Sequence, residues 1–324
     1  MKIAIYGYGN LGRGVECAIR QNADAELVGI FTRRPVSVIK GACAPVYPSS
    51  DIMKFKNAID VLILCSGSAT DLPGMTPALA RHFNVVDSFD THSRIPDHFA
   101  AVDLAAKEGG KVAVISAGWD PGLFSIARAY LSAALPDGTE HTFWGRGVSQ
   151  GHSDAIRRIN GVIDARQYTV PIDRSVMAVR SGSEAAATPY ERHRRECYVV
   201  AADGADLDSI ENKIKTMPGY FLGYDTTVTF ISMEELHRAH SAMPHGGTVI
   251  RTGKTGQCTE NRHTAEFSLK LDSNPEFTGS VLVCVARAAQ RMAIRGDVGC
   301  KTVLDIPPSY YSNLSPDELR ATLL

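Results

Sequence analysis

The 324-residue sequence lacks an excess of charge of either sign. Its 34 lysines and arginines are balanced by 35 aspartates and glutamates, which gives a formal net charge of −1. A chain without a basic excess is a poor nucleic-acid coat and a poor ligand for anionic membranes. Its apolar runs, such as 61–65 and 281–286, are far shorter than the ~20 residues that span a bilayer. We therefore predict neither a nucleic-acid partner nor a membrane association.

The sequence also lacks any Cys-x-x-Cys pair among its seven scattered cysteines. An odd, dispersed set in a chain of this length is typical of reduced thiols rather than of a disulfide framework. The first residues lead directly into a strand-like run, so we expect no secretory leader and predict a cytoplasmic location. His237 and His240 lack the i, i+4 spacing of a zinc-binding helix, and we predict no metal site.

The first third of the chain alternates short apolar runs with helix-compatible stretches. This alternation predicts an α/β domain with a doubly wound parallel sheet that helices cover on both faces. The sequence predicts strands at 2–6, 26–31, 61–65, 84–87 and 111–115, and helices that include 76–82 and 99–107.

The pattern changes near residue 118, where Asp120 could cap a helix with Pro121 at its first position. Strands then dominate, which predicts an α+β domain with a mixed sheet, and an apolar helix follows at about 276–294. We place the first domain at 1–118, completed by a C-terminal segment at 295–324, and the second domain at 119–294. The expected strands of the second domain are 141–145, 167–171, 197–201, 227–231, 248–252 and 264–271.

A G-x-G-x-x-G string follows the first predicted strand and opens a helix. In this context the string is the fingerprint of a Rossmann-type dinucleotide-binding domain. Gly7 would make the tight turn, Gly9 would let the pyrophosphate approach the backbone, and Gly12 would let helix and strand pack closely. The helix N-terminus, at Asn10 and Leu11, would face the pyrophosphate.

The end of the second predicted strand indicates which dinucleotide binds. An acidic residue there would suit the ribose hydroxyl of NAD, but the chain has Thr32, Arg33 and Arg34. Two guanidiniums and a hydroxyl suit the 2′-phosphate of NADP; the alternative is a solvated basic turn. A small-residue turn with Cys65, Gly67, Ser68 and Thr70 follows the third predicted strand and is a further candidate for cofactor contact.

Several strings outside the glycine motif carry candidate substrate residues, each with a plain structural alternative. Trp119 lies in SAGWDPG and Trp144 in HTFWGRG, and either could be a core aromatic. Asp120 could simply cap a helix. The basic run that ends at Arg195 could be a solvated strand edge, and His245 in MPHGG could sit in a simple turn.

Together these strings resemble the NADP-dependent diaminopimelate dehydrogenase family. The matching strings run in order over nearly the whole chain: IYGYGNLGRGVE, VGIFTRRP, CSGSATD, VDSFDTH, SAGWDPG, HTFWG, SQGHSDA, QYTVP, RRECYVVA, MPHGG and KLDSNP. The resemblance implies reversible oxidative deamination of the D-centre of meso-2,6-diaminopimelate to L-2-amino-6-oxopimelate and ammonia, in lysine biosynthesis. It also implies a homodimer whose second domain binds substrate and dimerises.

The resemblance also implies roles for individual residues. Asp90 and Asp120 would hold the D-centre near the nicotinamide, and either could relay the proton of its amine. Trp119, Trp144, Gln150 and Gly151 would shape that end of the site. Thr169, Arg195, His245 and Asn274 would recognise the distal L-centre, where Arg195 suits a carboxylate.

Two other functions remain open on the residues alone. One is another reductase of the aspartate-derived pathway, such as a homoserine dehydrogenase, although the SAGWDPG and SQGHSD strings speak against it. The other is a non-catalytic protein that senses NADP, although Asp90, Asp120 and Arg195 favour catalysis.

Overall fold

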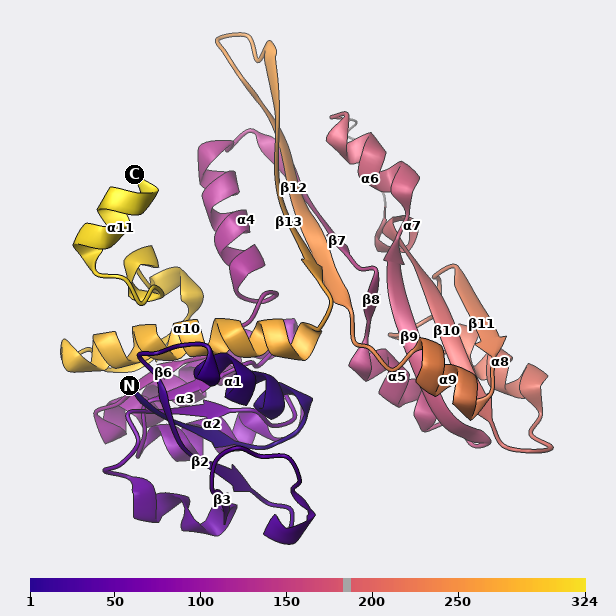
Figure 1. Cartoon of the computed structure of the whole chain (residues 1–324). Coiled ribbons are helices and arrows are strands. Elements are labelled where there is room, and N and C mark those ends of the chain that lie inside the picture. The colour runs from indigo at the N-terminus through magenta and orange to yellow at the C-terminus, as the bar shows by residue number, and fades with distance from the viewer. Residues whose placement is uncertain (183–187) are drawn as a thin grey trace. The chain divides into compact units, whose positions relative to one another are not determined.

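The computed structural model describes residues 1–182 and 188–324 and shows two compact units (Figure 1). The first unit comprises Met1–Ile126 and Pro275–Leu324, and the second comprises Ala127–Asn274. The sequence-based boundary instead placed residues 275–294 in the second domain. These residues form most of α10 (Asn274–Ile294), which packs in the first unit.

The first unit is built on a seven-stranded parallel sheet with the order β14-β6-β5-β4-β1-β2-β3. This is the predicted doubly wound sheet, extended at its edges by two short strands that sequence periodicity did not indicate. The strands are β1 (Lys2–Tyr6), β2 (Glu26–Thr32), β3 (Val46–Pro48), β4 (Val61–Leu64), β5 (Val85–Asp87), β6 (Val112–Val114) and β14 (Gly299–Lys301).

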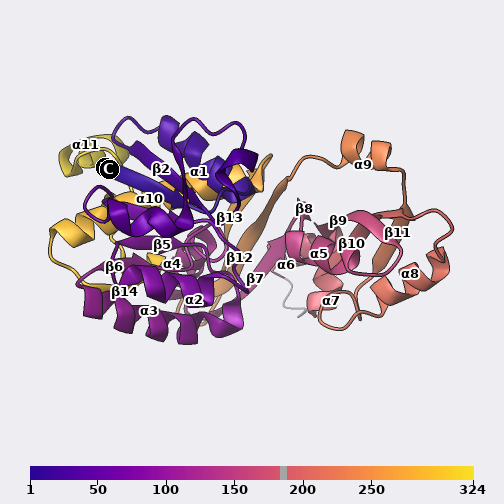
Figure 2. The same ribbon diagram turned by 90° about the horizontal axis from the view of Figure 1, so that it is seen from below.

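Helices lie on both faces of the sheet (Figure 2), and alternate residues of its strands pack against opposite faces. Ile3 and Ile5 face α1 (Asn10–Arg20) and α10, whereas Ala4 faces α2 (Leu72–Ala80) and α3 (Ile95–Gly109). Because both faces are covered, the strands are apolar at nearly every position, which explains the continuous apolar runs in the sequence.

Two glycines let α1 and α10 approach each other at backbone distance. A Cβ atom added to Gly14 would lie 2.3 Å from the Pro275 carbonyl oxygen, and one added to Gly279 would lie 2.5 Å from the Gly14 carbonyl carbon. The last helix, α11 (Pro316–Leu323), begins with the capping box that the sequence predicts, in which Ser315 accepts the Glu318 N–H and Glu318 accepts the Ser315 N–H.

The helix expected to begin at Asp120 begins instead at Leu123, as α4 (Leu123–Ala134). The expectation that Asp120 is the N-cap and Pro121 the first helical residue is therefore wrong. Gly122 lies between them and the helix with φ +135°, outside the helical region. The backbone N–H of Leu123 bonds Gly118 O at 3.1 Å, so residues 118–123 form a tight turn before the helix.

The second unit contains two sheets in its described part, and the presence of a mixed sheet beside helices confirms the predicted α+β domain. One is mixed, in the order β11-β10-β9-β8, and the other is antiparallel, in the order β13-β12-β7. The strands are β7 (Gly138–Trp144), β8 (Gly147–Val148), β9 (Val162–Pro171), β10 (His193–Ala201), β11 (Thr226–Phe230), β12 (His245–Thr255) and β13 (Asn261–Leu271).

Short helices accompany these sheets, and β12 and β13 form a long hairpin (Figure 1). The helices are α5 (Gln150–Arg157), α6 (Asp173–Arg180), α7 (Pro189–Arg192), α8 (Leu207–Lys215) and α9 (Met233–Ala239). The core beside the mixed sheet joins α5 and α8 to β9 and β10 through Ile156, Ile210, Ile214 and Cys197. Among the described residues, no helix is long and apolar enough to cross a bilayer.

Candidate functional site

The glycine turn after β1 has one open position and two crowded ones. Gly7 has φ +97°, and a Cβ there would lie 2.6 Å from the Cys65 carbonyl oxygen. A Cβ at Gly12 would lie 2.3 Å from the Gly7 carbonyl oxygen, whereas one at Gly9 would meet nothing within 4 Å. Gly9 is also the residue that precedes α1. The open space therefore lies at a helix N-terminus, which fits a pyrophosphate.

Tyr8 lies between the first two glycines of this turn, and hydrogen bonds hold both its side chain and its backbone. Its hydroxyl donates to the buried Glu16 carboxylate, whose other oxygen accepts the Cys43 N–H at 2.7 Å. Its carbonyl oxygen accepts a hydrogen bond from the Arg34 guanidinium. Burial, together with the Glu16 hydrogen bond, raises the pKa of the Tyr8 phenol. Arg34 therefore ties the end of β2 to the glycine turn.

Arg33 forms a two-point ion pair with Asp71, through Nη1 at 2.9 Å and Nη2 at 2.7 Å. Asp71 also accepts the Gly67 N–H at 3.0 Å, and the Arg33 hydrogen bond lowers the pKa of its carboxyl. Thr32 is buried, and its hydroxyl accepts the Arg34 N–H at 3.1 Å. The basic turn at Thr32, Arg33 and Arg34 is thus joined to the turn after β4 by the Arg33–Asp71 ion pair. Arg33 itself is more than half exposed.

Asp90, the first candidate acid, contacts the same turn. The Ser68 hydroxyl donates to its carboxylate at 2.5 Å and accepts its backbone N–H at 2.9 Å. Asp120, the second acid, follows Trp119 in the loop after β6. The Trp119 indole is buried edge-on against Phe124, with ring centroids 5.3 Å apart. Cofactor-turn and acidic candidates therefore share the carboxyl-end edge of one parallel sheet, where such sheets bind ligands.

In the second unit, Arg195 and Thr169 lie opposite each other on β10 and β9. Arg195 Nη1 donates to the Thr169 hydroxyl, and its guanidinium lies 4.1 Å from the centre of the Tyr224 ring. The side chain is buried, and its Nε has no hydrogen-bond partner among the described residues. Burial lowers the pKa of the Arg195 guanidinium. No carboxylate in the described parts of the chain forms an ion pair with it.

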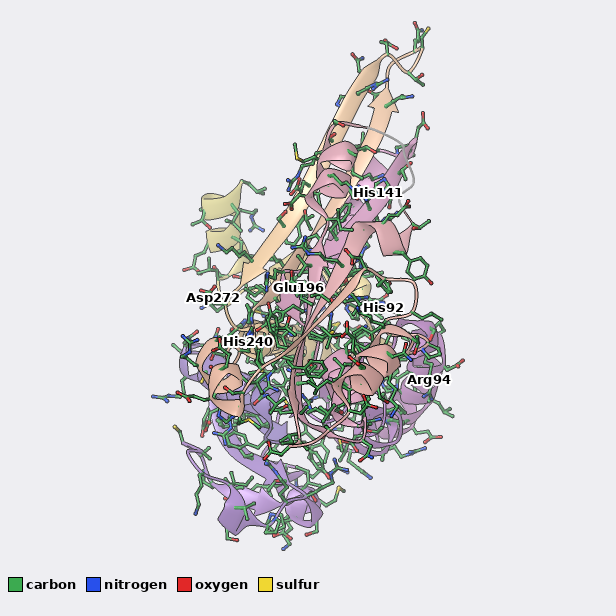
Figure 3. The ribbon with its side chains drawn as sticks, turned by 90° about the vertical axis from the view of Figure 1, so that its right-hand side faces the viewer. His92, Arg94, His141, Glu196, His240 and Asp272 are labelled. Atoms are coloured by element: carbon green, nitrogen blue, oxygen red, sulfur yellow. The ribbon has the colours of Figure 1, made fainter. Side chains whose placement is uncertain are left out.

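The neighbouring basic residue behaves differently. Arg194 is exposed and pairs with Glu196 at 3.2 Å. Glu196, which is labelled in Figure 3, also pairs with Arg146 at 2.6 Å. Arg194 is therefore a solvated residue, as the structural alternative proposed, although β10 is an inner strand of its sheet. That alternative does not describe Arg195, because alternate residues of a strand point to opposite faces.

His245 begins β12 and packs on the glycine-rich corner between β7 and β8. A Cβ at Gly147 would lie 2.4 Å from the His245 ring, and Gly147 is paired with Thr169 in the sheet. At the same corner, the Trp144 N–H donates to His193 Nε2 at 2.8 Å, and the two rings stack with centroids 5.4 Å apart. The structure thus brings His245, Thr169 and Trp144 to one corner of the second unit.

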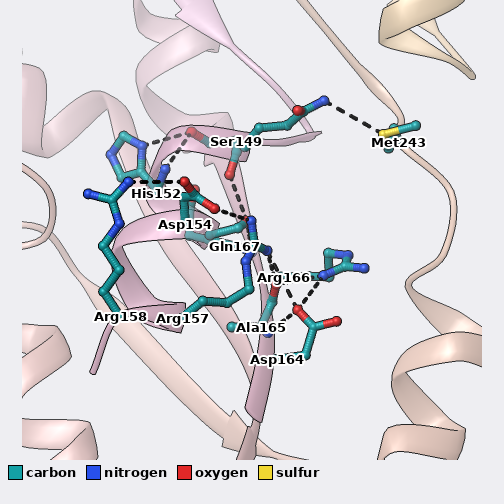
Figure 4. A network of polar contacts seen from close by, with 12 residues as sticks. Ser149, His152, Asp154, Arg157, Arg158, Asp164, Ala165, Arg166, Gln167 and Met243 are labelled. Carbon is teal, nitrogen blue, oxygen red and sulfur yellow. Dashed lines mark hydrogen bonds and ion pairs between the residues drawn. The ribbon is translucent and has the colours of Figure 1, made fainter. Parts of the chain in front are cut away.

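Gln150 opens α5, and its amide Nε2 lies 3.6 Å from the Met243 sulfur (Figure 4). The Met243 carbonyl oxygen accepts the Asn274 N–H at 2.9 Å. The helix is capped by Ser149, whose hydroxyl accepts the His152 N–H, and a Cβ at the exposed Gly151 would meet nothing within 4 Å. Met243 therefore contacts both of the candidate residues Gln150 and Asn274.

Sequence reasoning missed four residues that shape these sites: Glu16, Gly147, Tyr224 and Met243. Gly147 and Met243 lie inside strings that were singled out, FWGRG and MPHGG, so closeness to a motif was an available signal. Glu16 was detectable only as a carboxylate on the helix that follows the glycine turn. Tyr224 gave no local signal because its role depends on the pairing of β10 with β11.

Comparisons with known proteins agree with this geometry. Residues 118–273 match the family model described as the diaminopimelic acid dehydrogenase C-terminal domain. A curated meso-diaminopimelate D-dehydrogenase from Ureibacillus thermosphaericus is 57% identical over 325 residues, with 100% of this chain and 99% of the relative covered.

Two solved structures resemble the whole chain. A C. glutamicum DAP dehydrogenase in complex with DAP is 46% identical, with a TM-score of 0.94, and 100% of this chain and 99% of that chain are covered. An engineered D-amino acid dehydrogenase bound to NADP+ is 45% identical, with a TM-score of 0.89 and the same coverage.

Proposed function

The chain belongs to the meso-diaminopimelate D-dehydrogenase family, and on that premise we propose how its residues perform the reaction. It is an NADP-dependent amino-acid dehydrogenase. The balanced reaction converts meso-2,6-diaminopimelate, NADP+ and water into L-2-amino-6-oxopimelate, ammonium, NADPH and a proton. The substrate carries two carboxylates and two ammonium groups, so its site needs acids and cations together.

The assignment of the substrate-binding residues rests on one observation, which is the burial of the Arg195 guanidinium. It is buried with a hydroxyl and an aromatic ring as neighbours, and buried charges are normally paired. We assign it to the distal carboxylate of the substrate, which would supply the missing negative charge. Thr169, His245 and Asn274 complete this group, and Trp144, Gln150 and Gly151 bound the part of the substrate nearer the reacting centre.

The first unit supplies the groups that act at the D-centre. NADP+, when bound, would supply the acceptor for the hydride of the D-centre carbon. Its pyrophosphate would be held by the glycine turn and the start of α1, at Gly7, Gly9, Asn10, Leu11 and Gly12. Its 2′-phosphate would be bound by Thr32, Arg33 and Arg34. The turn after β4 would make the remaining contacts, through Cys65, Gly67, Ser68 and Thr70. These groups fit an anionic dinucleotide because Gly9 leaves open space at the start of α1. The Arg33 guanidinium, at the end of the neighbouring strand β2, is more than half exposed.

Asp90 and Asp120 would bind the D-centre ammonium, and Trp119 would shape that end of the site. The amine must lose its proton before hydride leaves, so one of these carboxylates takes that proton directly or through a water molecule. Water then adds to the resulting imine carbon, and ammonia departs as the carbonyl forms. Binding of the distal L-centre by Arg195 would fix which centre reacts.

The test is to mix the purified protein with NADP+ and the meso, LL or DD isomer separately, and to follow NADPH absorbance. Turnover of the meso isomer alone supports the proposal. Binding of NADP+ without turnover of any isomer would favour the NADP-sensing protein instead. Arg158→Met, which removes an exposed arginine that follows α5 and pairs with Asp154, should retain activity.

We further propose that the protein is a homodimer that works in the cytoplasm. The family resemblance supports the dimer. The seven cysteines, all of them free thiols, support a reducing compartment. Light scattering after size-exclusion chromatography would test the first statement, and a mass near 35 kDa rather than twice that value would contradict it.

A further inference from the structure

The side chain of Asp87, at the end of β5, is fully buried and accepts four hydrogen bonds. One carboxylate oxygen accepts the backbone N–H groups of Phe89 at 3.1 Å and Ser116 at 2.9 Å. The other oxygen bonds the Thr76 hydroxyl and His98 Nε2, both at 2.7 Å. A buried carboxylate is costly unless it is satisfied in this way, so the arrangement fixes the Asp87 side chain tightly.

The two backbone groups that Asp87 binds belong to the loops that carry both candidate acids. Phe89 directly precedes Asp90, and Ser116 lies near the start of the loop that leads from β6 to Asp120. The Ala117 N–H also bonds the Asp87 carbonyl oxygen at 2.9 Å. Asp87 is therefore bonded to both loops, although it is not itself one of the groups assigned to substrate or cofactor.

Ser116 shows that the loop conformation depends on these bonds. Its φ is +55°, a left-handed conformation that is uncommon for a residue other than glycine. Such a conformation persists where the surroundings over-determine it. Here the N–H groups on both sides of the Ser116 α-carbon, its own and that of Ala117, are held by Asp87.

His98 supports Asp87 from α3. Its side chain is buried, and its ring lies 4.3 Å from the Phe89 ring between centroids. It donates to Asp87 through Nε2, and its Nδ1 has no hydrogen-bond partner among the described residues. The imidazole thus orients the carboxylate and packs on one of the two loops that the carboxylate holds.

Resting on the proposed function, we propose that Asp87 is a positioning residue for the reaction, held in place by His98. It acts through Phe89 and Ser116, which set the backbone positions of Asp90 and Asp120 relative to each other. Because effects on orientation appear in turnover rather than in cofactor affinity, its loss should slow hydride transfer while the glycine turn still binds NADP+.

The experiment compares Asp87→Asn with Asp103→Asn in the full chain. Asp103 is a matched control, because it accepts the Cys300 N–H at 2.9 Å and so ties α3 to the sheet without contacting either loop. We expect Asp87→Asn to lower kcat with the meso isomer by about 100-fold and to raise the primary isotope effect with substrate deuterated at the D-centre. Its Kd for NADPH should stay within about twofold of wild type, and Asp103→Asn should retain the wild-type kcat.

A second pair of variants keeps the test decisive if Asp87→Asn does not fold. His98→Gln retains a donor for Asp87, whereas His98→Leu retains bulk without one, so turnover should be higher in the glutamine variant. Wild-type kcat and isotope effect in Asp87→Asn, or equal turnover in the two His98 variants, would overturn the proposal. If wild-type protein fails to turn over the meso isomer, the proposed function itself is wrong and this inference falls with it.

Discussion

Ser68 and Asp90 are joined by two reciprocal hydrogen bonds: the Ser68 hydroxyl donates to the carboxylate at 2.5 Å and accepts the backbone N–H of Asp90 at 2.9 Å. The two residues follow neighbouring strands, β4 and β5, so this pair joins a candidate cofactor turn to a candidate acid. We infer that binding of the cofactor at the turn after β4 and the position of the Asp90 carboxylate depend on each other.

Replacement of Ser68 should therefore affect both ligands. Ser68→Ala removes a charge-assisted hydrogen bond, whose loss corresponds to roughly tenfold or more in affinity or rate. We expect kcat/KM for meso-diaminopimelate to fall by about that factor, with a smaller rise in the Kd for NADPH. Steady-state kinetics and fluorescence titration measure the two quantities. Ser68→Thr keeps the hydroxyl and should restore much of the loss; identical behaviour of both variants would count against the linkage.

Replacement of Arg33 should change cofactor preference. Arg33→Met removes a guanidinium assigned to the 2′-phosphate, and hydrogen bonds to charged groups contribute about 1.5–3 kcal/mol. We expect the affinity for NADP+ to fall by at least about tenfold while that for NAD+ changes little. Arg81→Met is the control, because Arg81 pairs with Glu108 on the surface of the same unit. Equal losses for both cofactors in Arg33→Met would contradict the phosphate role.

Replacement of Arg195 should weaken substrate binding without weakening the fold. Arg195→Met removes a buried charge that has no ion-pair partner among the described residues, and it retains most of the side-chain volume, so we expect little loss of stability. We expect KM for meso-diaminopimelate to rise by at least about tenfold, and simpler D-amino acids that lack a distal carboxylate to become relatively better substrates. Arg194→Met, one residue away on the exposed face, should leave KM unchanged. An unchanged KM in Arg195→Met would contradict the assignment of Arg195 to the distal carboxylate.

The acid stability of the second unit should depend on Glu266. Hydrogen bonds from Arg180, at 2.7 and 2.8 Å, and from Ser268 and Thr248 lower its pKa from 4.5 to about 2. A lowered pKa stabilises the fold above pH 4.5, and this contribution is lost as the pH falls from 4.5 to about 2. Glu266→Gln should flatten the pH dependence of urea unfolding in that window. Glu234→Gln, at an exposed residue of α9, is the control and should not change this pH dependence.

Sequence reasoning succeeded where local pattern determines structure. Continuous apolar runs and the Gly7–Gly12 spacing predicted the parallel sheet and its turn because both depend on neighbouring residues. It failed at Asp120, because the positive φ of Gly122 cannot be inferred from a good capping sequence. It also misplaced 275–294, since an apolar helix does not indicate which sheet it covers, and the Gly14–Gly279 contact that decides this joins distant segments.

His152 should remain neutral well below the pH at which histidine normally takes up a proton. Burial of its ring against Phe221, with the nearby Arg195 charge, lowers its pKa from 6.5 to about 4. Between these values the unfolded chain binds a proton that the folded chain does not, so stability falls as the pH decreases from 6.5 to about 4. Histidine NMR titration should show one imidazole with a midpoint near 4, absent in His152→Gln. The same variant should lose part of the pH dependence of unfolding in this window, whereas replacement of His237, on α9, should not.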